Sequence, residues 1–495
     1  MKKAKVALLL PAYMGSNHNL FLGVGYLASV LKSVGNEVRI IDEDALYWIY
    51  QCKKCLPALL HAEKRVIFEL NRFAPDMICE MINTTNYKNA LRMLQYVRRE
   101  FPHAYMVVGG PHISTSYEEF HRWHSNMYDA AIIGEGEESL LELCSNIVSH
   151  NNNPIPGVRL SRNPKVYIKR KFIDINQLPC PDRDAFFEIY DAKEKRLAYD
   201  NYRRVFYSSL PGFSNGFARV VASRGCYNNC KFCSPGKFWQ NPMNDLPCRR
   251  VRSAKNVIAE IEDLLKKGIH AIYFDDPTFP IKSDISFFNE FERLIKYKGL
   301  SFSWGAPICS SEIDSKILDR LQNIGFTFTY FGLESHNIQH LSNFNKIQDI
   351  NKCLTLIREC KMRGIHCDAS YQIGLPKDDV EDIKEGVDWI FHEGLERNVF
   401  FSITAIWPGT ALAYEYNVSG DCYEPEFDKK TFQERTGLYY YEQGVDKIEQ
   451  FYTNCSGTYH FIPMSTALDI RSYIFRSGLR NRFENMNIGA KNDTK

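Results

Sequence analysis

Short apolar runs alternate with helical stretches along most of the chain, and this alternation limits the possible folds more than any other feature of the sequence. In the first 150 residues the apolar runs include KVALLLPA (5–12), EVRIID (37–42) and AYMVVGG (104–110). A stretch such as 23–35 lies between two of them, with apolar residues three and four apart and a glycine at its end. Buried strands that alternate with helices are typical of a parallel sheet covered on both faces. We therefore predict a doubly wound, Rossmann-like α/β domain over residues 1–150.

A second alternating series begins near residue 216. Its six predicted strands, each followed by a helix or a loop, are 219–225, 271–274, 301–305, 326–332, 367–374 and 398–405. Six units are fewer than the eight that close a complete barrel, so we predict a partial (β/α)6 barrel over 216–415. Turn-rich sequence predicts a linker over 151–215. A small, mostly helical cap with a polar tail is predicted over 416–495.

Composition excludes several classes of protein. The 495 residues carry a net charge of only +2, which gives no electrostatic footprint for nucleic acid. No apolar stretch approaches the roughly 18 residues that a membrane-spanning helix needs. Two lysines near the start precede an apolar run, but that run is too short for a signal peptide. We expect a cytoplasmic protein that binds neither nucleic acid nor a membrane.

Three cysteines stand directly after the first strand of the second series. Cys226, Cys230 and Cys233 have the spacing C-x-x-x-C-x-x-C. In parallel α/β sheets and barrels this carboxyl edge of the strands is where ligands bind. Three thiolates are one short of the four that would ligate every iron of a 4Fe–4S cluster, which leaves one iron open to a substrate or cofactor. A zinc site with His270 or another cysteine as fourth ligand is the alternative at this point.

The stretch CYNNCKFC, with the aromatic Phe232 before its third cysteine, resembles the signature of the radical S-adenosylmethionine (SAM) superfamily. The resemblance extends over about residues 215–410. It implies that the three cysteines hold a 4Fe–4S cluster and that SAM chelates the open iron. The SAM contacts that it implies are Phe232, Phe274, Asp275, Glu334 and Gly374, in the motifs CKFC, YFDDPTF, GLES and QIGLP. Glu334 could instead be a solvated carboxylate at a helix start, and Asp275 could cap a turn.

The first domain resembles the cobalamin-binding domain that precedes the barrel in a subset of these enzymes. The residues that carry this second resemblance follow the third, fourth and fifth strands: Thr84, Thr85, Gly109, Gly110, His112, Gly134, Glu135 and Gly136. The first loop, PAYMGSNHN, lacks the D-x-H-x-x-G motif, so the sequence does not indicate that His18 ligates cobalt. His112 could instead be a loop histidine that bonds backbone.

The two resemblances together imply an activity. SAM would be cleaved reductively to a 5′-deoxyadenosyl radical, which abstracts a substrate hydrogen, and a methyl group would pass from methylcobalamin to an unactivated carbon or a phosphinate. The alternative is a radical oxidative cyclase, ring-contraction, dehydration or epimerisation enzyme without methyl transfer. A non-catalytic binding protein is a third hypothesis. The implied partners are a small-molecule substrate and an electron donor such as flavodoxin or ferredoxin.

Overall fold

The computed structural model describes residues 3–12, 21–151, 153–203, 212–213, 216–234, 238–240, 246–442 and 457–474. Two compact units make up the chain. The first consists of Met1–Val205, Gln240–Leu246 and Trp407–Asp428, and the second of Phe206–Trp239, Pro247–Ile406 and Lys429–Lys495. Within the described ranges, no helix is both long and apolar enough to cross a membrane. The predicted polar tail lies outside the described residues.

The first unit contains a six-stranded sheet with the order β2-β1-β3-β4-β5-β6. Its strands are β1 (Lys5–Leu10), β2 (Glu37–Asp42), β3 (Met77–Met81), β4 (Tyr105–Gly109), β5 (Ala130–Ile132) and β6 (Val158–Leu160). Strands β1 to β5 pair in parallel and β6 pairs antiparallel with β5. The sheet confirms the predicted doubly wound domain and adds one edge strand from the region predicted as a linker.

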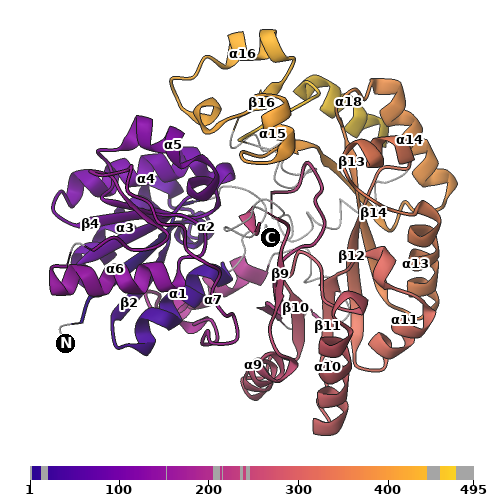
Figure 1. Cartoon of the computed structure of the whole chain (residues 1–495), viewed down its shortest axis with the longest axis horizontal. Coiled ribbons are helices and arrows are strands. Elements are labelled where there is room, and N and C mark those ends of the chain that lie inside the picture. Colours follow the sequence, from indigo (N-terminus) through magenta and orange to yellow (C-terminus); the bar gives the residue numbers. More distant parts are fainter. Residues whose placement is uncertain are drawn as a thin grey trace. The chain divides into compact units, whose positions relative to one another are not determined.

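Helices cover both faces of this sheet, as Figure 1 shows for the part coloured indigo to magenta. The helices of the unit are α1 (Leu22–Ser33), α2 (Glu43–Cys52), α3 (Ala58–Phe73), α4 (Tyr87–Glu100), α5 (Pro111–His124), α6 (Glu137–Ser149) and α7 (Ala192–Arg203), with the 3-10 turns η1 (Thr84–Asn86) and η2 (Asp184–Phe187). Helix α1 packs beside α6, and α2 packs beside α3. Because β3, β4 and β5 run parallel, the loops that follow them share one edge of the sheet.

The second unit contains six parallel strands in the order β14-β13-β12-β11-β10-β7. Their bounds are β7 (Ala218–Val220), β10 (Ala271–Phe274), β11 (Ser303–Pro307), β12 (Phe326–Glu334), β13 (His366–Ile373) and β14 (Val399–Ile403). Each strand pairs with the next one along the chain, and the ends of the row, β7 and β14, are not paired with each other. This is the partial (β/α)6 barrel that the sequence predicts.

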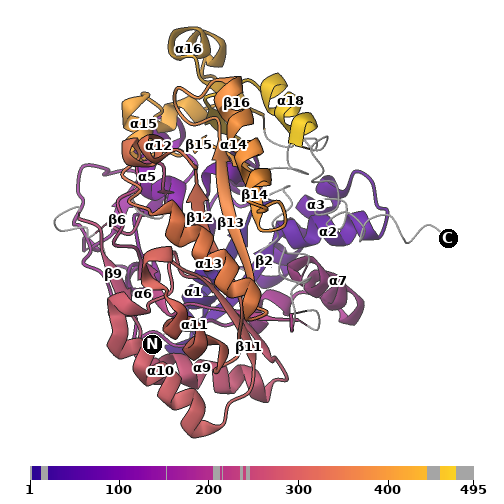
Figure 2. The same cartoon turned by 90° about the vertical axis from the view of Figure 1, so that its right-hand side faces the viewer.

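The helices of the barrel lie along one side of the strand row, as Figures 1 and 2 show. They are α9 (Ala254–Lys266), α10 (Ile285–Lys298), α11 (Ser315–Gln322), α12 (Ile338–Asn343), α13 (Ile350–Met362) and α14 (Val380–His392). Side-chain caps fix several helix starts. Ser253, the N-cap predicted for the first of these helices, accepts from Asn256 N–H at 3.2 Å, and Asp314 accepts from Ile317 N–H at 2.9 Å.

Short strands complete the second unit. β8 (Ser223–Gly225) and β9 (Arg249–Val251) form an antiparallel pair. β15 (Ala405–Ile406), β17 (Thr458–His460) and β16 (Tyr439–Tyr441) form a second small sheet, which we call the C-terminal sheet. Helices α16 (Lys429–Thr436) and α18 (Met464–Ile474) accompany it. The C-terminal region thus contains the expected helices and a sheet that the sequence did not reveal.

One segment groups with a different part of the chain than the sequence suggests. Trp407–Asp428, with α15 (Ala411–Glu415) and the 3-10 turn η6 (Gly420–Tyr423), belongs to the first unit. The buried carboxylate of Glu424 accepts from the Tyr87 hydroxyl at 2.5 Å and bonds His124 Nε2 at 2.7 Å. These polar contacts, made with helices more than 290 residues earlier in the chain, explain the grouping.

Candidate functional site

The cysteine-containing loop of the second unit begins at β8 and ends at β9. Gly225, the last residue of β8, has φ of 90°, and a Cβ atom there would lie 2.0 Å from the carbonyl oxygen of Cys248. Just before it, the carboxylate of Asp276 accepts from Ala222 N–H at 3.1 Å and from the Ser223 hydroxyl at 2.5 Å. Burial raises the pKa of Asp276 to about 7 against these hydrogen bonds. A strand pair and a buried acid therefore hold the start of the loop.

Cys226, Cys230 and Cys233 are all partly buried on this loop. The N–H of Asn228 points to the sulfur of Cys226 at 3.4 Å. Burial raises the pKa of Cys226, and it raises that of Cys230 to about 12. Three half-shielded thiols with a backbone N–H directed at sulfur are the donor set of an iron–sulfur cluster, so these residues fit the implied 4Fe–4S group.

Within the described ranges, no three His, Cys, Asp or Glu side chains converge on a point where one metal ion could sit. A 4Fe–4S cluster does not require such convergence, because each cysteine binds a different iron. The alternative of a zinc site completed by His270 is wrong. His270 precedes β10, which runs parallel to β7, so it lies at the opposite edge of the sheet from the cysteines.

Two supports hold the middle of the loop. The hydroxyl of Tyr227 donates to the carboxylate of Glu312, which follows β11 in the 3-10 turn η5 (Ser310–Glu312). The N–H of Lys231 donates to the carbonyl of Phe344 at 3.0 Å, and the rings of Phe232 and Phe344 meet edge to face with centroids 6.1 Å apart. The loop is thus fastened to the segments after β11 and β12.

Glu334 ends β12 in a conformation that is rare for a residue with a side chain. Its φ is 65°, and the register between β12 and β13 shifts between Gly332 and Glu334. The carboxylate folds back along the strand, so that a Cβ atom on Gly332 would lie 1.9 Å from Oε1. Oε2 accepts from the Ser370 hydroxyl at 3.2 Å and from Gln372 Nε2 at 3.0 Å. Such strain and close fitting are found where a functional group must be held in place.

Lys346 lies between this carboxylate and the cysteine loop. Its Nζ is 3.7 Å from Glu334 Oε1, and its side chain is only 19% exposed. Burial disfavours the charge of Lys346, but the carboxylate of Glu334 and the thiols of Cys230 and Cys309 outweigh burial and raise the pKa. Lys346 is therefore a charged ammonium group that faces both the carboxylate and the loop.

The ring of Phe274 does not face the interior of the barrel. It is completely buried against Phe279 at 4.6 Å, Phe291 of α10 at 5.8 Å and Trp304 at 5.5 Å, measured between ring centroids. Successive side chains of a strand point to opposite faces, so Tyr273 faces the other way and packs with Phe328. The ring of Phe274 is therefore part of the core under the helices, and the predicted contact of this residue with SAM stays a prediction.

Two other predicted SAM contacts lie at neighbouring strand ends. Asp275 follows β10 and pairs with Arg219 of the adjacent β7. Gly374 follows β13, and a Cβ atom there would meet Ile462 at 3.0 Å. The structure thus places Asp275, Glu334 and Gly374 at the carboxyl ends of β10, β12 and β13 in the same sheet.

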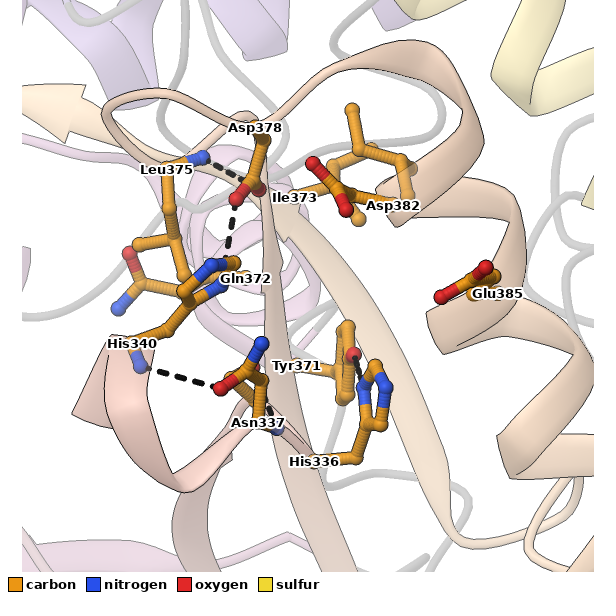
Figure 3. Close-up of a pocket in the computed structure, with 12 residues that line it drawn as sticks. His336, Asn337, His340, Tyr371, Gln372, Ile373, Leu375, Asp378, Asp382 and Glu385 are labelled. Atoms are coloured by element: carbon orange, nitrogen blue, oxygen red, sulfur yellow. Dashed lines mark hydrogen bonds and ion pairs between the residues drawn. The ribbon is translucent and has the colours of Figure 1, made fainter.

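A pocket adjoins Glu334, and Figure 3 shows the side chains around it. Its lining residues come from the ends of β12 and β13 and the starts of α12 and α14: Ser335, His336, Asn337, His340, Tyr371, Gln372, Ile373, Leu375, Asp378, Asp382, Ile383 and Glu385. His340 Nδ1 lies 3.3 Å from Asp378 Oδ1, and burial raises the pKa of Asp378 to about 6. His336 Nδ1 bonds the Tyr371 hydroxyl at 2.6 Å. Three carboxylates make this an acidic pocket.

In the first unit, the ends of β3 and β4 bring Thr84 and His112 together. Thr84 Oγ1 and His112 Nδ1 are 3.1 Å apart, and the ring of Tyr87 lies 4.4 Å from that of His112. Burial lowers the pKa of His112 to about 3, so the ring is neutral. His112 therefore bonds a threonine hydroxyl inside the protein. Thr85 is also buried, in the same 3-10 turn as Thr84.

The predicted glycines differ in their surroundings. A Cβ atom on Gly110 would lie 2.7 Å from the carbonyl oxygen of Ile82, whereas nothing lies within 4 Å of one on Gly134. Space for a ligand therefore exists at Gly134. The carboxylate of Glu135 accepts from Ile173 N–H at 3.2 Å and so fastens the region predicted as a linker. The remaining predicted glycines are Gly109, which ends β4, and Gly136, which precedes α6.

The same unit buries two carboxylic acids near the end of β1. Glu43 accepts from Ala12 N–H at 2.7 Å and pairs with Arg92 at 3.0 Å. Glu80 is 2% exposed, and no described group hydrogen-bonds either of its carboxyl oxygens. Burial, together with the nearby carboxylate of Glu43, raises the pKa of Glu80 well above its usual range. His18 lies outside the described residues.

Two protein families match the chain, one in each of its two units. The B12 binding domain family matches residues 19–144, and the radical SAM superfamily matches residues 220–390. An uncharacterized methyltransferase of Pyrococcus horikoshii is 26% identical over 440 residues, covering 85% of this chain and 84% of that protein. The cytidylyl-2-hydroxyethylphosphonate methyltransferase of Streptomyces wedmorensis is 23% identical over 435 residues, covering 81% of this chain and 80% of that protein.

A solved structure shows the same fold. The radical SAM methyltransferase TsrM from Kitasatospora setae, with cobalamin and a 4Fe–4S cluster bound, aligns with a TM-score of 0.62 at 17% identity over 84% of this chain and 78% of that one. The barrel region, residues 220–390, is thus a radical SAM domain. The B12-binding domain ahead of the barrel makes the chain a cobalamin-dependent, methyltransferase-like radical SAM protein, with a 4Fe–4S cluster, SAM and cobalamin as its cofactors.

The structure adds polar residues to the site that the sequence analysis missed. Ser370 and Gln372 occupy alternate positions of β13 and both bond Glu334. Polar and apolar residues alternate along β13 (HCDASYQI), and this period of two, which puts the polar side chains on one face, is a signal that could have identified them. Lys346 had no such signal, because only the folded chain brings it to Glu334.

Proposed function

We propose that the protein transfers a methyl group to an unactivated carbon, or to a phosphinate, of a small-molecule substrate. The observation that carries this proposal is the shared edge of the barrel, where a three-cysteine loop and an anchored carboxylate occur in a chain that also has a B12-binding domain. Two relatives named as methyltransferases align with most of the chain and support methyl transfer over the other radical outcomes.

The residues of the barrel would have separate roles. Cys226, Cys230 and Cys233 would hold the cluster, and Glu334 would bind the ammonium group of SAM. Lys346 would offset the negative charge of the cluster and its thiolates. When bound, the cluster and SAM supply a 5′-deoxyadenosyl radical and cobalamin supplies the methyl group.

The remaining assignments belong to the same proposal. Residues 1–150 would form the cobalamin-binding domain, with Thr84, Thr85 and the open backbone at Gly134 in contact with the cofactor. Residues 216–415 would form the catalytic barrel. Reduction of the cluster needs an external electron donor of the flavodoxin or ferredoxin type.

An anaerobic experiment tests the proposal. The protein is reconstituted with iron, sulfide and hydroxocobalamin, and then incubated with SAM and a reductant, after which 5′-deoxyadenosine and S-adenosylhomocysteine are quantified. We expect retained cobalamin and both products. Cys230→Ala should abolish 5′-deoxyadenosine, whereas Cys52→Ala, an exposed cysteine of the first unit, should not.

Each contrary result has a definite meaning. Loss of cobalamin on gel filtration would contradict the proposal. Formation of 5′-deoxyadenosine without S-adenosylhomocysteine would favour the oxidative or cyclising alternative. Persistence of 5′-deoxyadenosine in Cys230→Ala would show that the cysteine loop does not hold the cluster.

A further inference from the structure

We propose that Gln372 and Thr404 act as positioning residues, which aim the carboxylate of Glu334 at the ammonium group of SAM, and that the C-terminal sheet keeps them in place. The inference rests on the proposed contact between Glu334 and SAM. It extends that contact to Gln372 and, outside the matched radical SAM region of 220–390, to Thr404 and the C-terminal sheet. It is carried by a continuous row of hydrogen bonds within the second unit, which runs from Glu334 through Gln372 and Thr404 to His460.

The amide of Gln372 has only one orientation that suits its neighbours. Its Nε2 lies 3.0 Å from Glu334 Oε2, and its Oε1 lies 3.1 Å from Thr404 Oγ1. A carboxylate oxygen accepts and never donates, so the amide nitrogen must face Glu334. The amide oxygen then faces the threonine hydroxyl, which can donate to it. The carboxylate therefore sets the amide orientation, and the Thr404 hydroxyl, which also lies 3.2 Å from the carbonyl oxygen of Ile373, supports it by donating to the amide oxygen.

Thr404 is itself fixed from both sides. Its N–H donates to the carbonyl of Ile373 at 3.0 Å, which ties it to the end of β13. Its carbonyl lies 2.9 Å from Nδ1 of His460 in β17. A carbonyl oxygen can only accept, so Nδ1 carries the proton. His460 Nε2 then accepts from the Thr458 hydroxyl at 2.8 Å.

The histidine has no freedom to move. His460 is completely buried, and the ring of Tyr441 stacks on it at 4.0 Å. The Tyr441 hydroxyl donates to the carbonyl of Ile462 at 2.9 Å. Ile462 in turn lies against Gly374, at the end of the strand that carries Gln372. The C-terminal sheet therefore braces the row at two points.

The row has a direct consequence for the reaction. Glu334 holds a rare backbone conformation with positive φ, so its side chain depends on partners to keep one position. Ser370 and Gln372 both bond the same oxygen, Oε2. Loss of the amide would leave the carboxylate free to turn toward Lys346, and the ammonium group of SAM would lose an aligned partner.

The experiment compares two ligands on the anaerobically reconstituted enzyme by equilibrium dialysis. SAM carries the amino acid group, and 5′-methylthioadenosine lacks it. We expect Gln372→Ala to weaken SAM binding about tenfold and Thr404→Val about threefold, since each removes one hydrogen bond of the row. Binding of 5′-methylthioadenosine should change less than about twofold, and Thr404→Ser should restore the SAM affinity.

A matched control separates positioning from general damage. Thr329 is another buried threonine of the barrel, and its hydroxyl donates to the carbonyl of Ala306 at 3.0 Å without reaching Glu334. Thr329→Val should lower the melting temperature as Thr404→Val does, yet leave the SAM affinity unchanged. Equal weakening of both ligands in Thr404→Val would overturn the inference, and so would an unchanged SAM affinity in Gln372→Ala.

The contact of Glu334 with SAM and the positioning role of Gln372 and Thr404 can be refuted separately. Glu334→Gln tests the proposed function, because it should weaken SAM selectively over 5′-methylthioadenosine. If Glu334→Gln has no selective effect, the SAM contact itself is refuted. If Glu334→Gln is selective while Gln372→Ala and Thr404→Val are not, the contact holds and the positioning role is refuted.

Discussion

Substituting Gly332 by alanine should damage SAM binding while leaving the fold intact. A Cβ atom at this position would lie 1.9 Å from Glu334 Oε1, and ordinary contact needs at least 3.4 Å. The carboxylate must therefore move by about 1.5 Å. At that displacement the bonds to Ser370 and Gln372, now 3.2 and 3.0 Å, are lost or badly lengthened. Two such bonds contribute about 2 kcal/mol, which corresponds to roughly a thirtyfold weaker SAM affinity.

The assay is equilibrium dialysis of SAM together with a thermal melt of the same preparation. The clashing atom is the end of a flexible side chain, so the melting temperature of Gly332→Ala should fall only by the loss of the two hydrogen bonds, about 2 to 4 °C for each kcal/mol. Gly23→Ala, in α1, is the matched control, because nothing lies within 4 Å of its added Cβ atom. Gly332→Ala with wild-type affinity for SAM would refute the placement of the carboxylate. A large loss of stability would show that the backbone, and not the carboxylate, occupies the space.

Three further predictions concern the cysteine loop and the buried acid. Gly225→Ala should reduce iron incorporation severalfold, because the new Cβ atom would lie 2.0 Å from a carbonyl oxygen. Gly268→Ala is the control: it also has positive φ, of 80°, but open space around it, and it should not reduce iron incorporation. Tyr227→Phe should speed iron release to a chelator, because the loop loses its bond to Glu312. Glu80→Gln should match wild-type stability near pH 4.5 and exceed it increasingly at higher pH in urea melts. The pKa of Glu80 is raised in the folded state, so the folded protein keeps a proton that the unfolded chain releases above pH 4.5. The free energy of unfolding of the wild type therefore falls by up to about 1.4 kcal/mol per pH unit relative to Glu80→Gln. Equal slopes of unfolding free energy against pH for the two proteins would contradict this prediction.

Much of the fold was predictable because long, regular patterns produce it. Each of the six barrel strands is a largely buried stretch next to a helix or loop, and the order of the strands in the sheet follows the sequence. The C-terminal sheet has strands of only two or three residues, too short to show a period. The grouping of Trp407–Asp428 with the first unit depends on contacts made by Glu424, which no local pattern reveals.

The candidate site was predictable wherever a motif combined with a strand end. The cysteines and Glu334 stand at such ends, and the structure puts them on one edge of the sheet. The motif around Phe274 does not show which way its ring points, whereas the alternation of strand side chains turns the ring toward the helices; its contact with SAM stays a prediction. The roles of Thr404 and His460 could not be predicted from the sequence. Thr404 bonds Gln372, which holds Glu334, and His460 bonds Thr404, and these contacts join distant parts of the chain.

One short segment connects the two halves of the candidate site. Phe344 holds the cysteine loop through its carbonyl and its ring, and Lys346, two residues later, faces the carboxylate of Glu334. A displacement of this segment would change the loop and the carboxylate together. Glu334 adopts positive φ at a cost of about 1 kcal/mol or more, which only the surrounding contacts can offset. The strain at the strand end is therefore sustained by the same elements that position the cysteines, so cluster loss and weakened SAM binding should occur together when this segment is disturbed.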